Sequence, residues 1–333
     1  MTRALVTGAT GLVGANVVEA LNRAGWDVRI LRRTTSRLDA LRDLNYEESI
    51  GDILDEESLL AAMRGVNVVF HVAGAADYWR KGPEHLYRIN VEGTRTVVQA
   101  ALKAHIDRLV YTSSVSALGP APDPHHPVDE QHHYDLPPHV FPYAHSKWLA
   151  EQEVQKGVAA GLDAVIVNPS IVIGPRDVYL TTGSLFKNMR RGLPFVPRGG
   201  SGVVDARDVA LGHLAAAERG RTGARYIISA ANLSHMALAR LIAEVMGVRP
   251  PLLEVPAWVV PPLAFLFDLG RALRLPLPAD GRTLRLATYW FYVDNTRSRV
   301  ELGLTYRPIR PAIEDALAWL QARQSPRASE SQR

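Results

Sequence analysis

The sequence predicts an α/β protein built on a doubly wound parallel sheet, with a smaller C-terminal lobe that binds the substrate. Two observations predict this fold. Short apolar runs alternate with helical periodicity through the first half of the chain, at the spacing of βαβ units. In addition, a glycine-rich stretch follows the first apolar run directly, at the place where such sheets bind a nucleotide.

The glycine-rich stretch combines a strand, a turn and a helix. Residues 4–6 are apolar, and Gly8, Gly11 and Gly14 follow at GxxGxxG spacing. Gly8 allows a tight turn, Gly11 lets the backbone approach a pyrophosphate, and Gly14 allows close packing of helix on strand. The diphosphate then lies at the positive N-terminus of the helix. An ordinary turn is the alternative, but the position between strand and helix favours a Rossmann-type dinucleotide site.

The alternation of strands and helices continues to residue 169. It predicts an open sheet with helices on both faces and a ligand site beyond the carboxyl ends of the strands. We therefore assign residues 1–169 to a dinucleotide-binding domain that carries the catalytic residues. The further strands are expected at residues 27–31, 46–50, 66–72, 108–112 and 164–168, and helices at residues 93–104 and 146–160.

After Pro169 the alternation breaks down. Residues 170–324 are expected to form mainly the substrate-binding lobe, with segments such as 203–230 returning to the first domain. The polar residues 325–333 are expected to form a disordered tail. The loop at 119–142 is too long for a simple connection, so we expect it to be functional or mobile. Helices in the second half are expected near residues 208–219, 236–246 and 312–324.

Composition disfavours several classes of function. The 333 residues include no cysteine, so neither a disulfide framework nor a thiolate nucleophile is available. The chain enters a strand at once, leaving no room for a signal peptide, and we expect a cytoplasmic protein. A net charge of +4 from scattered Lys and Arg gives no support for nucleic-acid binding. We expect no metal site, because the loop histidines lack supporting carboxylates and are better read as solvated: His125, His126, His132, His133 and His139.

Residues 255–269 form the most apolar segment of the chain. Pro256, Pro261 and Pro262 interrupt it, and Asp268 lies near its end. The segment is shorter than the roughly 20 residues that a transmembrane helix requires, so we expect no membrane span. A core or pocket-lining helix is the favoured interpretation. An interfacial helix that makes peripheral membrane contact is the alternative.

Tyr143 and Lys147 are spaced four residues apart, which places both on one face of a helix. An ammonium group there can lower the pKa of the phenol and reach a bound ribose, so the tyrosine can exchange a proton at neutral pH. Any helix can carry such a pair by chance. Ser113 and Ser114 strengthen the case, because they end the strand expected at 108–112, at the carboxyl edge of the same sheet. A hydroxyl there can hold a substrate carbonyl oxygen beside the phenol.

In this order, the glycine motif, the sequence Tyr111-Thr112-Ser113-Ser114, and the Tyr143/Lys147 pair resemble an extended short-chain dehydrogenase/reductase of the NAD-dependent epimerase/dehydratase superfamily. The resemblance covers about residues 3–320. Segments 77–79 and 292–295 suit the dihydroflavonol-4-reductase-like branch, which includes proteins of the hopanoid-associated sugar epimerase type. Supporting matches lie at residues 51–55, 71–74, 90–94, 168–170 and 174–175.

The resemblance implies catalysis by a serine, a tyrosine and a lysine. Tyr143 is then the general acid in reduction, while Lys147 lowers its pKa and binds the nicotinamide ribose. Ser114 is the expected carbonyl partner and Ser113 the alternative, because the doublet leaves the register open. Asn90 is implied to support the site through backbone or water contacts.

The resemblance also implies which residues line the ligands. Asp52 and Ile53 would contact the adenine, Ala73 the phosphate–ribose region, and Pro169 with Ser170 the nicotinamide side. The residues expected at the cofactor are Gly8, Thr10, Gly11, Leu12, Val13, Gly14, Arg32, Arg33, Arg37, Asp52, Ile53, Val72, Ala73, Gly74, Thr112, Ser113, Tyr143, Lys147, Pro169, Ser170, Ile171 and Val172. Those expected at the substrate are Ala75, Tyr78, Trp79, Ser114, Val115 and Tyr179.

The choice between NAD and NADP depends on the charge at the end of the second strand. An NAD-selective site places Asp or Glu there, to bind the ribose 2′-hydroxyl. This chain has Arg32, Arg33 and Arg37 instead, with no carboxylate between them. Because arginines can pair with a 2′-phosphate, we expect NADP, with NAD as the alternative if these are solvated surface residues.

Three features typical of nucleotide-sugar enzymes in this family are missing. Residues 199–205 hold no Arg or Lys where such enzymes carry a diphosphate-binding arginine, although Arg198 is near. No Arg-x-Gly-Asp element follows, and the usual Val-Tyr-Gly is replaced by residues 117–119, Ala-Leu-Gly. Together with the aromatic residues above and the apolar 255–269 segment, these departures favour an apolar or aromatic carbonyl compound over a sugar nucleotide. Each aromatic could also be plain core.

The sequence therefore predicts an NADP-dependent oxidoreductase that reduces a ketone or aldehyde, or oxidises the secondary alcohol, of a small apolar or aromatic substrate. The alternatives are a nucleotide-sugar epimerase or dehydratase with transient hydride transfer, and a 3β-hydroxysteroid or hopanoid-type dehydrogenase. A non-enzymatic regulator is disfavoured because both Tyr143 and Lys147 are present. The resemblance also implies a homodimer formed through the helices at 93–104 and 146–160.

Overall fold

The structure is a computed structural model that describes residues 2–76, 78–273 and 281–324. The side chains at 78–81 and 271–272 lie outside the description, which includes two of the predicted substrate residues, Tyr78 and Trp79. The tail at 325–333, for which disorder is predicted, also lies outside the described residues.

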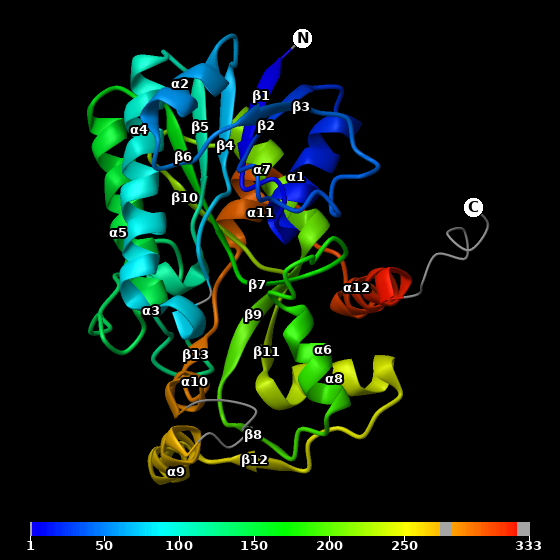
Figure 1. Ribbon diagram of the computed structural model, residues 1–333. Helices are drawn as coiled ribbons and strands as arrows, with labels where there is room; N and C mark the ends of the chain where they lie inside the picture. Colours follow the sequence, from blue (N-terminus) through cyan, green and yellow to red (C-terminus); the bar gives the residue numbers. More distant parts are fainter. Residues whose placement is uncertain (1, 77, 274–280, 325–333) are drawn as a thin grey trace, which may run out of the picture.

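A seven-stranded parallel sheet forms the larger part of the molecule (Figure 1). Its strand order is β10-β6-β5-β4-β1-β2-β3, so the order reverses between β1 and β4. In sheets of this kind ligands bind beyond the carboxyl ends of the strands at such a reversal. The strands are β1 (Arg3–Thr7), β2 (Asp27–Arg32), β3 (Glu47–Ile50), β4 (Val68–His71), β5 (Arg108–Thr112), β6 (Ala164–Pro169) and β10 (Arg225–Ile228).

Helices cover both faces of this sheet (Figure 1). Each face has its own apolar core, and the strand side chains alternate between the two cores, as the pleat requires. One face carries α1 (Leu12–Arg23), α7 (Ala206–Arg219) and α11 (Thr296–Leu302). The other carries α2 (Glu56–Met63), the π-helix η1 (Tyr87–Glu92), α4 (Gly93–Lys103) and α5 (Pro142–Ala159). The helix α3 (Tyr78–Leu86) packs against η1 and α5.

Two smaller sheets form the C-terminal part. β9 (Gly200–Asp205) pairs with β7 (Ile171–Ile173), β11 (Ala231–Ser234) and β13 (Trp290–Phe291). A separate pair consists of β8 (Phe195–Pro197) and β12 (Leu253–Val255). The helices of the C-terminal part are α6 (Gly183–Arg190), α8 (His235–Met246), α9 (Val260–Ala272), α10 (Gly281–Leu286) and α12 (Ile309–Gln324). Two short 3-10 helices lie at residues 115–118, after β5, and 257–259, before α9.

The fold class and the six strands predicted in the first half are confirmed. The seventh strand, β10, is one that the sequence analysis does not place as a strand, and α2 and α3 are likewise unforeseen. The predicted helix at 146–160 begins four residues earlier, at Pro142, because proline is well suited to the first turn of a helix. This difference matters because it brings Tyr143 into the first turn of α5.

The long loop at 119–141 is fastened to the C-terminal part. Ala121 N donates to Trp290 O at 2.6 Å, and Val128 N donates to Tyr292 O at 3.0 Å. Asp294 N in turn donates to Val128 O at 2.9 Å. The loop is therefore paired with the strand-like segment around β13 rather than lying free over the surface.

Arg176 joins the C-terminal part to the first helix of the large sheet. Its buried guanidinium donates to Glu19 at 2.9 Å and to both carboxylate oxygens of Asp43, at 2.8 and 2.7 Å. It also donates to Ala40 O at 2.6 Å. Its backbone has a φ of +77°, which non-glycine residues seldom adopt.

No described helix combines the length and the apolar character needed to cross a membrane. The apolar segment predicted at 255–269 contains most of α9. Val260 and Ala264 are buried, whereas Phe265, Leu266 and Leu269 are 49 to 64% exposed. One side of α9 is therefore packed and the other faces solvent.

Candidate active site

The glycine-rich turn between β1 and α1 has the geometry of a phosphate cradle. Gly8 has a φ of +68°, and a Cβ atom there would lie 2.5 Å from Ala73 N. A Cβ at Gly14 would lie 2.2 Å from Gly8 O, so only glycine lets α1 pack against this turn. At Gly11 a Cβ would meet nothing closer than 3.5 Å, which leaves its outer side open to a ligand. The residues therefore fit a dinucleotide whose diphosphate lies at the N-terminus of α1.

The segment after β4 forms the second wall of this cradle. Ala73 N donates to the Thr7 side chain at 3.2 Å, which holds the chain beside the turn after β1. Thr10, Leu12 and Val13 belong to that turn and to the first turn of α1. Val72 and Gly74 flank Ala73, as the resemblance implies for residues lining the phosphates and ribose.

The three arginines after β2 have different surroundings. Arg32 is engaged by Glu48, whose carboxylate lies 2.7 Å from its Nε atom. Arg37 is paired with Asp39 at 3.0 Å. Arg33 is exposed, and its side chain forms no ion pair with the part of the chain that the structure describes. Of the three, Arg33 is the guanidinium most available to a 2′-phosphate.

Tyr143 and Ser114 meet at the carboxyl edge of the sheet. Burial raises the pKa of Tyr143, and a hydrogen bond with the Ser114 side chain opposes that rise. The phenol is therefore protonated at neutral pH, as a proton donor must be. Ser113 contacts Glu151, two turns further along the same face of α5, and lowers its pKa. Of the doublet, Ser114 is the serine whose side chain hydrogen-bonds to the Tyr143 phenol.

Lys147 lies one turn after Tyr143 on α5 and is 5% exposed. Its ammonium donates to Thr112 O at 2.7 Å and to the Tyr111 hydroxyl at 3.3 Å. Burial lowers the pKa of Lys147 to about 8. The expected lowering of the Tyr143 pKa by this lysine is not seen in the protein alone, where burial dominates and the pKa is raised. The ammonium is directed to the backbone and to Tyr111 instead.

Glu151, which the sequence analysis does not single out, continues the same helix face. It follows Lys147 by four residues and is 2% exposed. Its carboxylate accepts from Asn168 Nδ2 at 2.7 Å and lies 3.5 Å from Arg225. Burial raises the pKa of Glu151, and Arg225 opposes this most strongly. Extending the Tyr143–Lys147 spacing by one more turn would have found it, because 143, 147 and 151 share one face.

Asn90 lies in the π-helix η1, an irregularity that often marks functional sites. Its side chain accepts from Ala75 N at 2.7 Å and donates to Ala75 O at 3.0 Å. It also donates to the Ser146 hydroxyl at 2.9 Å. Asn90 thus joins α5 to the chain that follows β4, which agrees with the supporting role implied for it.

The other predicted residues fall into three groups. Ile53 is buried against Gly93. The Asp52 carboxylate accepts a hydrogen bond from Leu54 N at 3.0 Å. Val115 is buried at the start of the short helix after β5, whereas Tyr179 is 49% exposed. The cofactor residues at the ends of β5 and β6 and in β7 also lie near this sheet edge: Thr112, Pro169, Ser170, Ile171 and Val172.

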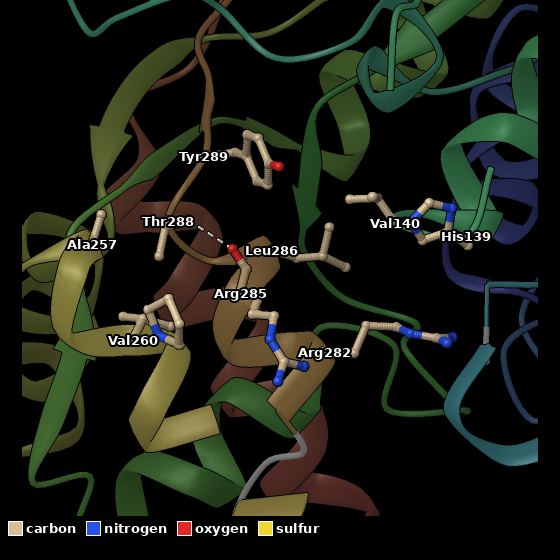
Figure 2. A pocket seen from close by; sticks show the side chains of 10 residues that line it. His139, Val140, Ala257, Val260, Arg282, Arg285, Leu286, Thr288 and Tyr289 are labelled. Atoms are coloured by element: carbon tan, nitrogen blue, oxygen red, sulfur yellow. Dashed lines mark hydrogen bonds between the residues drawn. The ribbon is translucent and has the colours of Figure 1, made fainter. Parts of the chain in front are cut away.

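A cavity of about 440 Å³ lies beside this site, between the start of α5 and helices α9 and α10 (Figure 2). Val140, Leu286 and Tyr289 line it and pack in the same apolar cluster as Tyr143. The Phe141 and Tyr143 rings lie 5.8 Å apart. Within the described residues, no group of three or more His, Cys, Asp or Glu side chains is arranged to hold a metal ion.

Comparisons with known proteins place this chain in a family. Residues 4–229 match the family described as "NAD dependent epimerase/dehydratase family". The chain is 39% identical to "Putative dihydroflavonol 4-reductase" of Synechocystis sp., over 95% of this chain and 94% of the relative. It is 32% identical to "Sterol demethylase protein B" of Methylococcus capsulatus, over 96% and 98%. The solved structure "Crystal structure of gox2253" superposes with a TM-score of 0.85 at 35% identity, covering 97% and 99% of the two chains.

Proposed function

Because the chain belongs to the NAD-dependent epimerase/dehydratase family and is an NAD(P)-dependent oxidoreductase of the extended short-chain dehydrogenase/reductase type, we propose that it is an NADP-dependent reductase. Its substrate is a ketone or aldehyde on a largely apolar or aromatic molecule, and Ser114, Tyr143 and Lys147 carry the catalysis. The observation that supports this most directly is the hydrogen bond between a protonated Tyr143 and Ser114 at the sheet edge.

Each residue has a task that its surroundings suit. Bound NADPH would supply the hydride to the carbonyl carbon. The Ser114 hydroxyl donates a hydrogen bond to the carbonyl oxygen, and Tyr143 gives that oxygen its proton as negative charge develops. Lys147 lies within α5 at the same edge, with an ammonium that can bind a ribose hydroxyl and favour the phenolate left behind. Asn90 fixes the chain after β4 against α5.

The preference for NADP rests on Arg33. It is exposed beside the end of β2, while Arg32 and Arg37 are held by Glu48 and Asp39. A 2′-phosphate at this position would pair with the free guanidinium, and an unphosphorylated ribose would gain nothing from it.

The test combines cofactor titration with a substrate panel. We expect NADPH to bind more tightly than NADH by fluorescence titration, and Arg33→Ala to weaken NADPH roughly 10- to 100-fold while leaving NADH unchanged. Reduction of aryl and alkyl ketones by NADPH should then fall roughly 10²- to 10⁴-fold in Tyr143→Phe.

The controls distinguish the alternatives. Arg42→Ala, a surface arginine paired with Asp39, should leave both affinities unchanged. Equal binding of NADH and NADPH by the wild type would refute the NADP assignment. Conversion of a nucleotide sugar without net oxidation of cofactor would favour the epimerase alternative.

A sterol or hopanoid-type alcohol is the second candidate substrate. It is favoured by the exposed apolar side of α9 next to the cavity, where Phe265 and Leu266 are more than half exposed. The similarity to a sterol demethylase protein points in the same direction. Including a steroid ketone and its alcohol in the panel decides whether this class is accepted.

A further inference from the structure

The cavity beside Tyr143 combines an apolar body with a cationic end. Its apolar wall consists of Val140, Ala257, Val260, Pro261 and Leu286. Arg282 and Arg285 also line it, three residues apart on α10, and no carboxylate is among its lining residues. Figure 2 shows Ala257 and Val260 on one side of Arg285, while the Arg282 side chain extends away from them, toward the side on which His139 and Val140 lie.

The two guanidinium groups are only partly compensated. Arg285 lies 3.4 Å from Asp268, but the same carboxylate accepts from Gly281 N at 2.8 Å, at the start of α10. Arg282 forms no ion pair with any of the described residues and is exposed at the cavity wall. The Thr288 hydroxyl donates a hydrogen bond to Arg285 O at 2.7 Å, which fixes the end of α10. Within the described residues, Asp268 is the one carboxylate that pairs with either guanidinium, and it pairs with Arg285.

We propose that this cavity selects substrates with an anionic end, a carboxylate or a phosphate, which Arg282 and Arg285 bind while the hydrocarbon body lies along the apolar wall. The proposal rests on the proposed function, because it assigns the carbonyl end of the same molecule to Tyr143. Its geometry supports this division: Val140, Leu286 and Tyr289 line the cavity and also pack in the cluster that contains Tyr143.

The arginine side chains that line the cavity favour a ligand with a negative charge over a wholly neutral ligand. Binding sites of roughly 300–1,000 Å³ are mostly apolar, and their few polar groups fix the orientation of the ligand. Here these groups are guanidiniums, whose planar donor pairs match the oxygens of carboxylates and phosphates. A neutral lipid would leave Arg282 without a counter-charge, whereas an anion would supply one.

The first experiment measures binding without turnover. Isothermal titration of the full chain with octanoate, octyl phosphate and 1-octanol compares two anions and a neutral molecule with the same tail. We expect at least one anion to bind about 10- to 100-fold more tightly than the alcohol. Arg282→Gln/Arg285→Gln should remove that preference, and the tighter anion identifies the carboxylate or the phosphate as the preferred group.

Two controls keep this test decisive. Arg240→Gln changes an exposed arginine on α8 that is absent from the cavity lining, and it should retain the preference. If the double variant is unfolded by circular dichroism, Arg282→Gln alone replaces it, since this exposed side chain has no ion pair among the described residues to lose. Octanol binding as tightly as both anions, or an undiminished preference in the folded variant, overturns the proposal.

The second experiment separates this inference from the proposed function. An aryl keto acid and its methyl ester are offered with NADPH, and the acid should have the higher kcat/KM through a lower KM. The double variant should raise KM for the acid alone and leave the ester unchanged. Anion binding without reduction of either compound would refute the reductase assignment while the binding result stands. Reduction of both compounds with equal KM would refute the anion selectivity.

Discussion

Lys147 and Glu151 are buried one turn apart on one face of α5, behind the phenol that is proposed to donate the proton, and each influences the pKa of the other. Burial lowers the pKa of the lysine to about 8 and raises the pKa of the glutamic acid. Glu151 raises the pKa of Lys147 and so favours its charged form. The charge of the Lys147 ammonium, which a bound ribose would contact, therefore depends on Glu151, a residue outside the Tyr143/Lys147 motif.

This pair makes the reaction sensitive to alkaline pH. Below pH 8 Lys147 is an ammonium, and above it the amine can neither favour the phenolate nor bind as a cation, so kcat/KM for reduction should fall as pH rises through about 8. In Glu151→Gln the lysine loses the charge that supports it, and the falling limb should move to lower pH. The measurement is a pH profile of kcat/KM at saturating NADPH.

The control for the pH profile is Glu153→Gln, on the same helix but paired with Arg95 and Lys156. This variant should leave the fall of kcat/KM at the same pH as in the wild type. An identical limb in wild type and Glu151→Gln would show that Glu151 does not act through Lys147. A lower kcat without movement of the limb would indicate a merely structural contribution.

For single residues, the sequence predicts which side chains form the site better than it predicts which residues they contact. The Tyr143–Lys147 spacing and the serine doublet could be read directly, because helical and extended periodicities are local. Which serine faces the phenol depends on how β5 ends, and the pairing of Arg32 with Glu48 depends on β2 lying beside β3. Glu151 draws its importance from Asn168 and Arg225, which are distant in sequence.

The turn between β1 and α1 allows the fold and the proposed cofactor site to be tested separately, since a side chain has room at Gly11 but not at Gly14. In Gly14→Ala the new methyl would lie 2.2 Å from Gly8 O, and we expect unfolding free energy to fall by about 1–3 kcal/mol. In Gly11→Ala the methyl meets only ordinary contacts, so stability should hold while NADPH binds roughly tenfold or more weakly.

Denaturant unfolding and cofactor titration of both glycine variants provide the measurement. A Gly11→Ala protein that binds NADPH normally would rule out close approach of the diphosphate at this position. The strand–turn–helix itself was predictable from its glycines. The π-helix at Asn90 and the start of α5 at Pro142 were not, because they depend on tertiary packing and on a single favourable proline.

Over the whole molecule, Arg176 holds the C-terminal part against α1. Arg176→Ala leaves the exposed Asp43 and the Ala40 carbonyl without their donor, and leaves Glu19 paired with Arg23 alone, so we expect a loss of about 1–3 kcal/mol in unfolding free energy. Arg176→Lys should recover part of it. The measurement is thermal and denaturant unfolding with and without NADPH.

The control is Arg221→Ala, which breaks an exposed pair with Glu301 and should not move the unfolding midpoint. An Arg176→Ala protein as stable as the control would contradict the assigned role. Sequence analysis could not find this contact, because it joins residues more than 130 positions apart. For the same reason β10 was not placed as a strand: its neighbour in the sheet is β6, and the connection between them passes through the smaller sheets.

The backbone pairing of the loop at 119–141 with the segment around β13 has a consequence for turnover. Ala121 and Val128 hydrogen-bond to Trp290 and Tyr292, and Tyr289, just before them, lines the cavity beside α5. Movement of the loop away from the sheet edge would therefore carry one cavity wall with it. If the proposed substrate binds in this cavity, we expect its entry and the release of product to need both segments to move together, so that the rate of this movement limits kcat.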